Sequence, residues 1–238
     1  MLKSYIFLSL CLIFIKTNEA SGIVSTQDPP NKALKSAVLE EDYQQLSHII
    51  DTTLDSITIA ITTVEQSTDR QKLLAVLEDL NEVLNIESKF SGINLGTPGL
   101  NEAKNSLTEF VNTIKDILTQ SIQTILGIQS AKRKFDTKPD FAEWINALDV
   151  LDYKTRAELG HGKAFLETAF SYIRARFVAT SPQASAEEKQ LFEDIANAKE
   201  QELLHFSQAL KKAAIERNHA FLKARDEQIK IKKATTQP

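Results

Sequence analysis

Two Glu-x-x-His motifs are the residues of this sequence whose types and spacing could do chemistry. Glu202 precedes His205 in ELLH and Glu216 precedes His219 in ERNH, so each motif places a carboxylate and an imidazole on one face of a helix. Di-iron bundles use this spacing, but they take the two motifs from two different helices. Here both motifs lie on one expected helix, 14 residues or about 21 Å apart, and cannot ligate a common ion within one chain. We therefore interpret them as part of a helix rich in glutamate and lysine, and expect neither a metal nor a cofactor.

The remaining motifs give no indication of catalysis. The sequence GHGK at 160–163 fails the phosphate-loop pattern, because Ala157 stands where the first glycine is required and Ala164 stands where serine or threonine is required. The sequence contains no G-x-S-x-G nucleophile elbow. His48 and His161 are isolated from other candidate residues. We expect a protein without catalytic residues that is not an enzyme.

The elements that position these residues are predicted to be helices. Apolar side chains recur at steps of three and four over 34–64, 67–90, 107–126, 141–151, 165–178 and 191–224, which is typical of amphipathic helices. The segment 56–64, SITIAITTV, alternates like a strand, but the helical stripe enters and leaves it in phase. The pattern predicts an all-α fold, an elongated antiparallel bundle of five or six amphipathic helices without disulfides.

Turn residues and caps indicate where these helices begin and end. Glycines predict breaks in FSGINLGTPG at 90–99 and in GHG at 160–162. Asp140 with Glu143, and Ser185 with Glu188, have the spacing of a capping box at a helix start. Trp144, the only tryptophan, is expected in the core.

The first 22 residues have the layout of a secretory signal peptide. A basic start is followed by an uncharged run of eleven residues, too short to span a bilayer, and by small residues that suit cleavage after Ala20 or Gly22. Cleavage would remove Cys11, the only cysteine, and leave a cysteine-free, secreted, extracellular chain. We expect a linker at 23–30, a single helical-bundle domain at 31–225 and a polar, basic tail at 226–238, with no transmembrane anchor.

Two classes of function agree with this composition. The formal net charge of −4 argues against a nucleic-acid binder. The first class is a non-enzymatic protein that binds another macromolecule, most simply a protein partner whose identity is unknown. Self-association through the C-terminal helix, as a coiled coil, belongs to this class. The alternative is a carrier of apolar ligands or a lipid-surface-binding protein. Phe165, Phe170 and Phe177 are its candidate ligand face, with core packing as their competing role.

Overall fold

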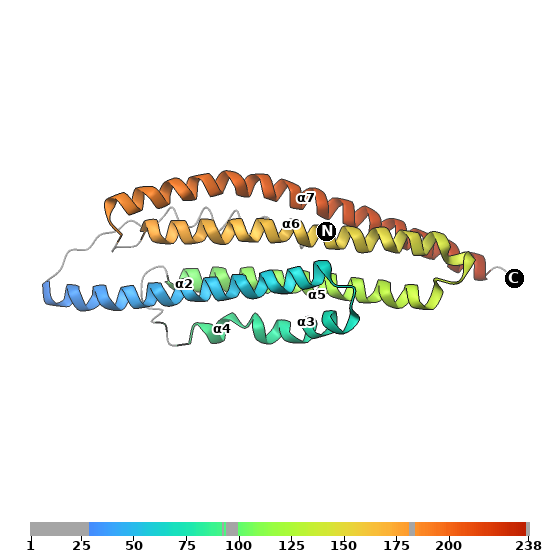
Figure 1. Cartoon of the computed structure of the whole chain (residues 1–238), viewed down its shortest axis with the longest axis horizontal. Coiled ribbons are helices and arrows are strands. Elements are labelled where there is room, and N and C mark those ends of the chain that lie inside the picture. Colours follow the sequence, from blue (N-terminus) through green and yellow to red (C-terminus); the bar gives the residue numbers. More distant parts are fainter. Residues whose placement is uncertain (1–28, 92, 94–99, 181–183, 237–238) are drawn as a thin grey trace. The chain divides into compact units, whose positions relative to one another are not determined.

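The described part of the chain consists of helices joined by short turns. A computed structural model describes residues 29–91, 93, 100–180 and 184–236, and Figure 1 shows their arrangement along the chain. The elements are α2 (Pro29–Gln66), α3 (Arg70–Val83), α4 (Ile86–Lys89), α5 (Leu100–Phe135), the 3-10 turn η1 (Pro139–Phe141), α6 (Ala142–Thr180) and α7 (Ala186–Thr236). These residues contain no strand, so the predicted all-α bundle is confirmed and the segment 56–64 is helical. The expected signal peptide and nearly all of the expected linker lie outside the described residues.

Helix α6 passes through Gly160 and Gly162 without a break, so the predicted joint at GHG is wrong. Neighbouring helices hold this segment. A Cβ built on Gly162 would lie 3.9 Å from Leu210 Cδ1, which is an ordinary contact, and a Cβ on Gly160 would lie 2.7 Å from Glu65 Oε1. The glycine at 160 therefore leaves room for the Glu65 side chain of α2. Packing on both sides outweighs the weak helix propensity of glycine.

The two predicted capping boxes have different outcomes. At the start of α7, the backbone N–H of Ser185 donates to Glu188 Oε2 at 2.8 Å, and the N–H of Glu188 donates to Ser185 Oγ at 3.1 Å, so this box is confirmed. The box at Asp140 and Glu143 is wrong, because Pro139 begins the 3-10 turn one residue earlier and Asp140 lies inside it. The predicted helix at 67–90 is divided into α3 and α4, with Asn85 as the N-cap of α4.

Contacts within the chain group into two compact units, and the long helices contribute to both. Unit 1 comprises residues up to 57, 82–115 and 166–204. Its core contains Leu46, Ile49, Ile57, Phe90, Val111, Ile114, Leu166 and Phe170. The buried hydroxyl of Thr53 accepts a hydrogen bond from Lys89 Nζ at 3.3 Å, which ties α4 to α2. An ion pair between Arg174 and Asp51 joins α6 to α2.

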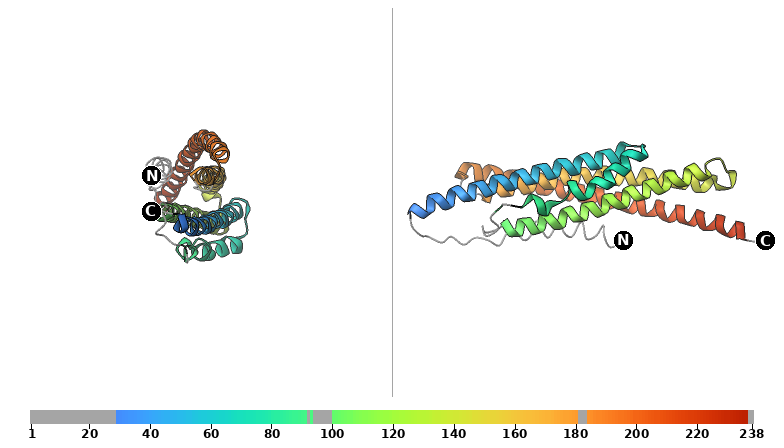
Figure 2. Two further views of the ribbon diagram at one scale, coloured as in Figure 1. Left: turned by 90° about the vertical axis from the view of Figure 1, so that its left-hand side faces the viewer. Right: turned by 90° about the horizontal axis from the view of Figure 1, so that it is seen from below.

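Unit 2 comprises residues 58–81, 116–165 and the chain from 205 onward. In this unit α5 and α6 form a hairpin about η1, as the right view of Figure 2 shows. Phe135 stacks on Phe141 at 4.5 Å between ring centroids and meets the edge of Trp144 at 5.5 Å. The cluster around them contains Ile128, Ile145, Ala147, Leu148, Leu151, Ala220 and Ala224. The predicted core position of Trp144 is therefore confirmed.

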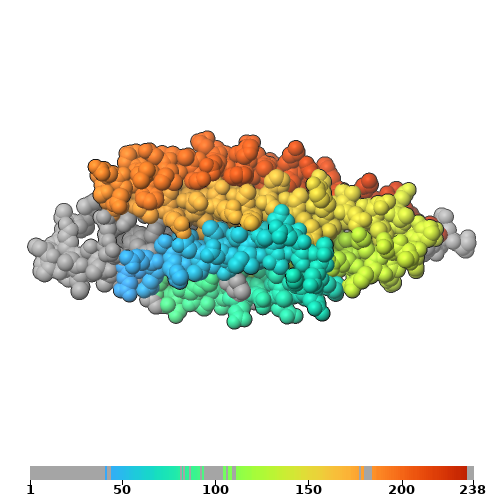
Figure 3. Space-filling model, in the orientation of Figure 1, coloured from blue at the N-terminus to red at the C-terminus, as the bar shows by residue number. Residues whose placement is uncertain are grey.

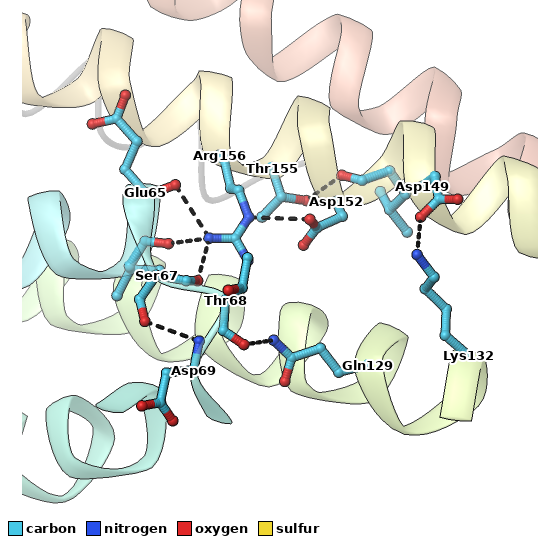
Figure 4. A network of polar contacts seen from close by, with 12 residues as sticks. Glu65, Ser67, Thr68, Asp69, Gln129, Lys132, Asp149, Asp152, Thr155 and Arg156 are labelled. Carbon is cyan, nitrogen blue, oxygen red and sulfur yellow. Dashed lines mark hydrogen bonds and ion pairs between the residues drawn. The ribbon is translucent and has the colours of Figure 1, made fainter. Parts of the chain in front are cut away.

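One arginine satisfies the backbone where α2 ends. The guanidinium of Arg156 on α6 donates to the carbonyl oxygens of Val64 at 2.7 Å, Glu65 at 3.2 Å and Ser67 at 2.7 Å (Figure 4). Its Nε donates to Asp152 Oδ2 at 3.1 Å, one turn earlier on α6. The last carbonyls of a helix lack partners inside the helix. A positive charge at this end also suits the helix dipole.

The rest of the turn between α2 and α3 is held in the same way. Gln129 on α5 donates from its amide to the Thr68 carbonyl at 3.1 Å. Ser67 Oγ accepts from the Asp69 N–H at 3.1 Å, and Asp69 Oδ1 accepts from the Gln71 N–H at 2.8 Å, which begins α3. Side chains of α5 and α6 thus donate hydrogen bonds to the carbonyls of two consecutive residues of this turn, Ser67 and Thr68 (Figure 4).

Replacing Gly162 by alanine should stabilise the protein by up to about 1 kcal/mol, because alanine is the better helix former and its methyl group meets Leu210 at ordinary contact distance. Gly127→Ala is the matched reference, since nothing lies within 4 Å of a Cβ there. Urea unfolding measures both. A loss of stability in Gly162→Ala beside a gain in Gly127→Ala would show that α6 is broken at this glycine.

Replacing Arg156 by methionine should lower the free energy of unfolding by about 3 kcal/mol, because three carbonyls lose a charged donor and Asp152 loses its partner. The exposed Arg133 provides the control variant Arg133→Met. Hydrogen exchange should show faster exchange in the turn at 67–69 of the Arg156 variant. Equal stability of the two variants would contradict a structural role for Arg156.

Candidate functional site

The two Glu-x-x-His motifs are engaged with lysines. Glu202 Oε2 accepts a hydrogen bond from Lys199 Nζ at 2.8 Å, one turn away on the same helix. Glu216 Oε2 accepts from Lys154 Nζ at 2.7 Å, across from α7 to α6. His205 and His219 are exposed. Within the described residues, no three histidine, cysteine, aspartate or glutamate side chains gather into a group that could hold a metal ion.

The predicted apolar ligand face is divided between the two units. Phe165 belongs to unit 2 and Phe170 to unit 1, and each side chain is only 2% exposed. Both are packed as core residues, which was the competing interpretation. The side chain of Phe177 lies outside the described ones. A ligand-binding role for these three residues stays a prediction.

A cavity of about 260 Å³ lies between α6 and α7 inside unit 2. Its lining consists of Lys154, Ala157, His161, Ala209, Lys212, Ala213 and Glu216. The two helices are antiparallel here, since Lys154 meets Glu216 while Gly162, further along α6, faces Leu210, which comes earlier in α7. Alanines supply the apolar part of the lining, and four ionisable groups supply the polar part.

The ionisable groups of this cavity influence one another. The hydrogen bond from Lys154 lowers the pKa of Glu216, and the electrostatic influence of Lys212 and His161 acts in the same direction. The same hydrogen bond raises the pKa of Lys154. The cavity rim therefore carries more positive than negative groups and can attract an anion. Its lining contains no hydroxyl or thiol nucleophile beside His161.

A second ion pair connects the same helices. Arg217 on α7 pairs with Glu158 on α6. Burial raises the pKa of the Glu158 carboxyl, and the attraction of Arg217 offsets only part of this rise. Desolvation of a carboxylate disfavours its charged form, so Glu158 destabilises the folded state when ionised relative to the same group in water.

This cluster could not be recognised from the sequence, because its members lie far apart in the chain. Lys154 and Glu216 are separated by 62 residues. In the sequence Glu216 pairs by its spacing with His219 on one helix, whereas in the structure Glu216 lies close to His161 and Lys154 of another helix. Only the antiparallel register of α6 and α7 could have indicated this combination.

The outer face of α7 carries a file of exposed apolar side chains in unit 2. Ile215, Leu222 and Ile229 are 45%, 40% and 41% exposed and follow one another at intervals of seven residues. We call these three residues the α7 file. Figure 3 shows α7, in orange and red, at the molecular surface. On the side of this stretch that faces the core, the buried residues include Ala213, Ala214, Ala220 and Ala224.

Basic residues surround the α7 file. Between 211 and 233, seven exposed residues are basic and one, Asp226, is acidic. The basic ones are Lys211, Lys212, Lys223, Arg225, Lys230, Lys232 and Lys233. The helix dipole accounts for cations in the last turn only. This concentration of positive charge stands in a chain whose formal net charge is −4.

Comparisons with protein-family models, with curated proteins and with solved structures find no match to this chain. In the part of the chain that the structure describes, none of the helices combines the length and the apolar character needed to cross a membrane.

The Glu158→Gln variant should gain stability relative to the wild type as the pH rises. Burial raises the pKa of Glu158 in the folded protein. The wild type therefore becomes less stable as this carboxyl ionises, whereas glutamine does not titrate. The difference in unfolding free energy, measured by denaturant at about pH 4 and about pH 7, should favour the variant more at the higher pH. Glu78 is exposed, so Glu78→Gln is the control that separates the effect of burial from the effect of removing a carboxylate. A difference that moves the opposite way would show that Arg217 outweighs desolvation.

Proposed function

We propose that this chain is a secreted, non-enzymatic helical-bundle protein that acts by binding another macromolecule. The α7 file carries the proposal. Three large apolar side chains aligned on the solvent side of one helix lose contact with water when a partner covers them, and this burial favours association. Secretion is supported by the signal-peptide layout of the first 22 residues.

The arrangement of α7 favours binding over a purely structural role for these residues. Alanines already supply the buried face of this stretch, so the core does not require Ile215, Leu222 or Ile229. Single exposed apolar residues are ordinary on protein surfaces. A file at constant spacing within a basic surface is a more specific pattern, because it matches an elongated partner.

The alternative function, carriage of an apolar ligand, gains no support from the α6–α7 cavity. Apolar ligands prefer cavities lined mainly by hydrophobic and aromatic side chains. This cavity instead presents Lys154, His161, Lys212 and Glu216. Phe165 and Phe170 do not belong to its lining.

A photo-crosslinking amino acid at position 222 should capture a macromolecule from the fluid into which the protein is secreted. The same amino acid at position 191 is the matched control, because Leu191 is also an exposed leucine of α7, at 56% exposure, but lies outside the α7 file. Adducts are measured by gel shift and mass spectrometry. Identical adducts at both positions, or none at 222, would contradict binding through this face.

A further inference from the structure

We infer that the α7 file is a docking seam for one acidic amphipathic helix of a partner protein. This inference rests on the proposed function and names the class of partner. It depends on two observations, the seven-residue spacing of the file and the sign of the charge around it.

The spacing fits a helical partner. Two helices that pack side by side at a small crossing angle repeat their contacts every seven residues, which is two turns. Ile215, Leu222 and Ile229 occupy the same position in three consecutive heptads. A partner helix that follows α7 can therefore meet each of them in turn with its own apolar residues.

The positions between the apolar residues decide the chemistry of the partner. Four residues before Ile215, Leu222 and Ile229 stand Lys211, Asn218 and Arg225 on the same side of the helix. Lys211 and Arg225 are exposed, and they belong to a surface with seven exposed basic residues and one exposed acidic residue. Carboxylates on the partner would complement this surface, set the register of docking and accelerate association.

A second copy of the chain is a poorer match for the same surface. Two copies joined file to file would bring the seven exposed basic residues of each chain together. Like charges at close range disfavour such a complex. The predicted self-association through this part of α7 is therefore less favourable than binding of an acidic helix.

An anionic membrane would also attract the positive charge but does not match the apolar pattern. Helices that lie in a membrane surface bury a broad apolar face, whereas the large apolar residues exposed on this stretch of α7 are the α7 file and Phe221. Polar side chains, Lys211, Asn218 and Arg225, alternate with its apolar residues along the same side. One helix fits a narrow seam better than a flat lipid surface does.

The test uses the full mature chain and a labelled synthetic peptide of about four heptads, with leucine at one position of each heptad and glutamate at the flanking positions. Fluorescence anisotropy measures its affinity. We expect binding that weakens by about tenfold or more when NaCl is raised from about 0.05 M to about 0.5 M. Leu222→Asn should raise the Kd by about tenfold or more, and the control Leu191→Asn should leave it unchanged.

A sister peptide with lysine in place of glutamate should not bind, and circular dichroism should show both protein variants folded. Binding that is indifferent to Leu222→Asn, or binding of both peptides, would overturn the inference. Binding to vesicles of phosphatidylcholine and phosphatidylserine but not to the peptide would show that the α7 file binds a lipid surface and not a helix. A dimer in light scattering that Leu222→Asn abolishes would show that the α7 file binds a second copy of the chain.

The crosslinking at position 222 distinguishes a wrong partner class from a wrong proposed function. If the acidic peptide fails to bind while position 222 still captures a macromolecule, the partner class is wrong and the proposed function stands. If the peptide fails and position 222 captures nothing, both are wrong.

Discussion

The hydrogen bonds from Arg156 to the end of α2 are the interaction on which the arrangement of unit 2 depends. A helix that ends inside a packed unit leaves carbonyl groups that must find donors, since an unsatisfied buried polar group is costly. Arg156 supplies donors to three of these carbonyls, and Asp152 holds the guanidinium in place. Because the contacts run from α6 to the turn between α2 and α3, they fix the register of these helices as well. Lys163 extends the same register with a hydrogen bond of 3.0 Å to Thr62 Oγ1.

The small residues of α6 and α7 complete this arrangement. Gly160 gives space to the Glu65 side chain, and Ala213, Ala214, Ala220 and Ala224 form most of the buried surface of α7 in unit 2. Alanine favours the helix and allows a neighbouring helix to approach closely. The register that follows brings Lys154 opposite Glu216, a pair that lines the α6–α7 cavity, and Glu158 opposite Arg217, a pair that connects the same two helices. The charged cluster is thus a consequence of helix packing.

The sequence predicted the helices better than it predicted their ends and their partners. Periodicity identified the long helices α2, α5 and α7, including 56–64 with its β-branched residues, because an amphipathic stripe is a property of the chain itself. It failed at Gly160 and Gly162, where α6 continues without a break and Glu65 and Leu210 of other helices lie close to the glycine positions. The charged cluster could not be predicted for a related reason, since Lys154 and Glu216 meet only through tertiary register. The exposed α7 file was also missed. The apolar periodicity over 191–224 does not separate the buried positions from the exposed ones, since Phe221 is 50% exposed while Ala213 and Ala224 are buried.

On α7 in unit 2, alanines are buried while larger apolar residues are exposed, and this arrangement bears on function. If large side chains were needed for burial, Ile215, Leu222 and Ile229 would face inward and the alanines outward. The observed order is the reverse, and it costs solubility, because exposed apolar side chains promote association with other molecules. The surrounding lysines and arginines offset that cost by keeping the surface hydrated, and they also restrict which molecules can cover the file. For the proposed binding role, an apolar seam within a positive field disfavours a like-charged surface and favours a negatively charged one, so we propose that the basic residues that hydrate this surface also select the partner.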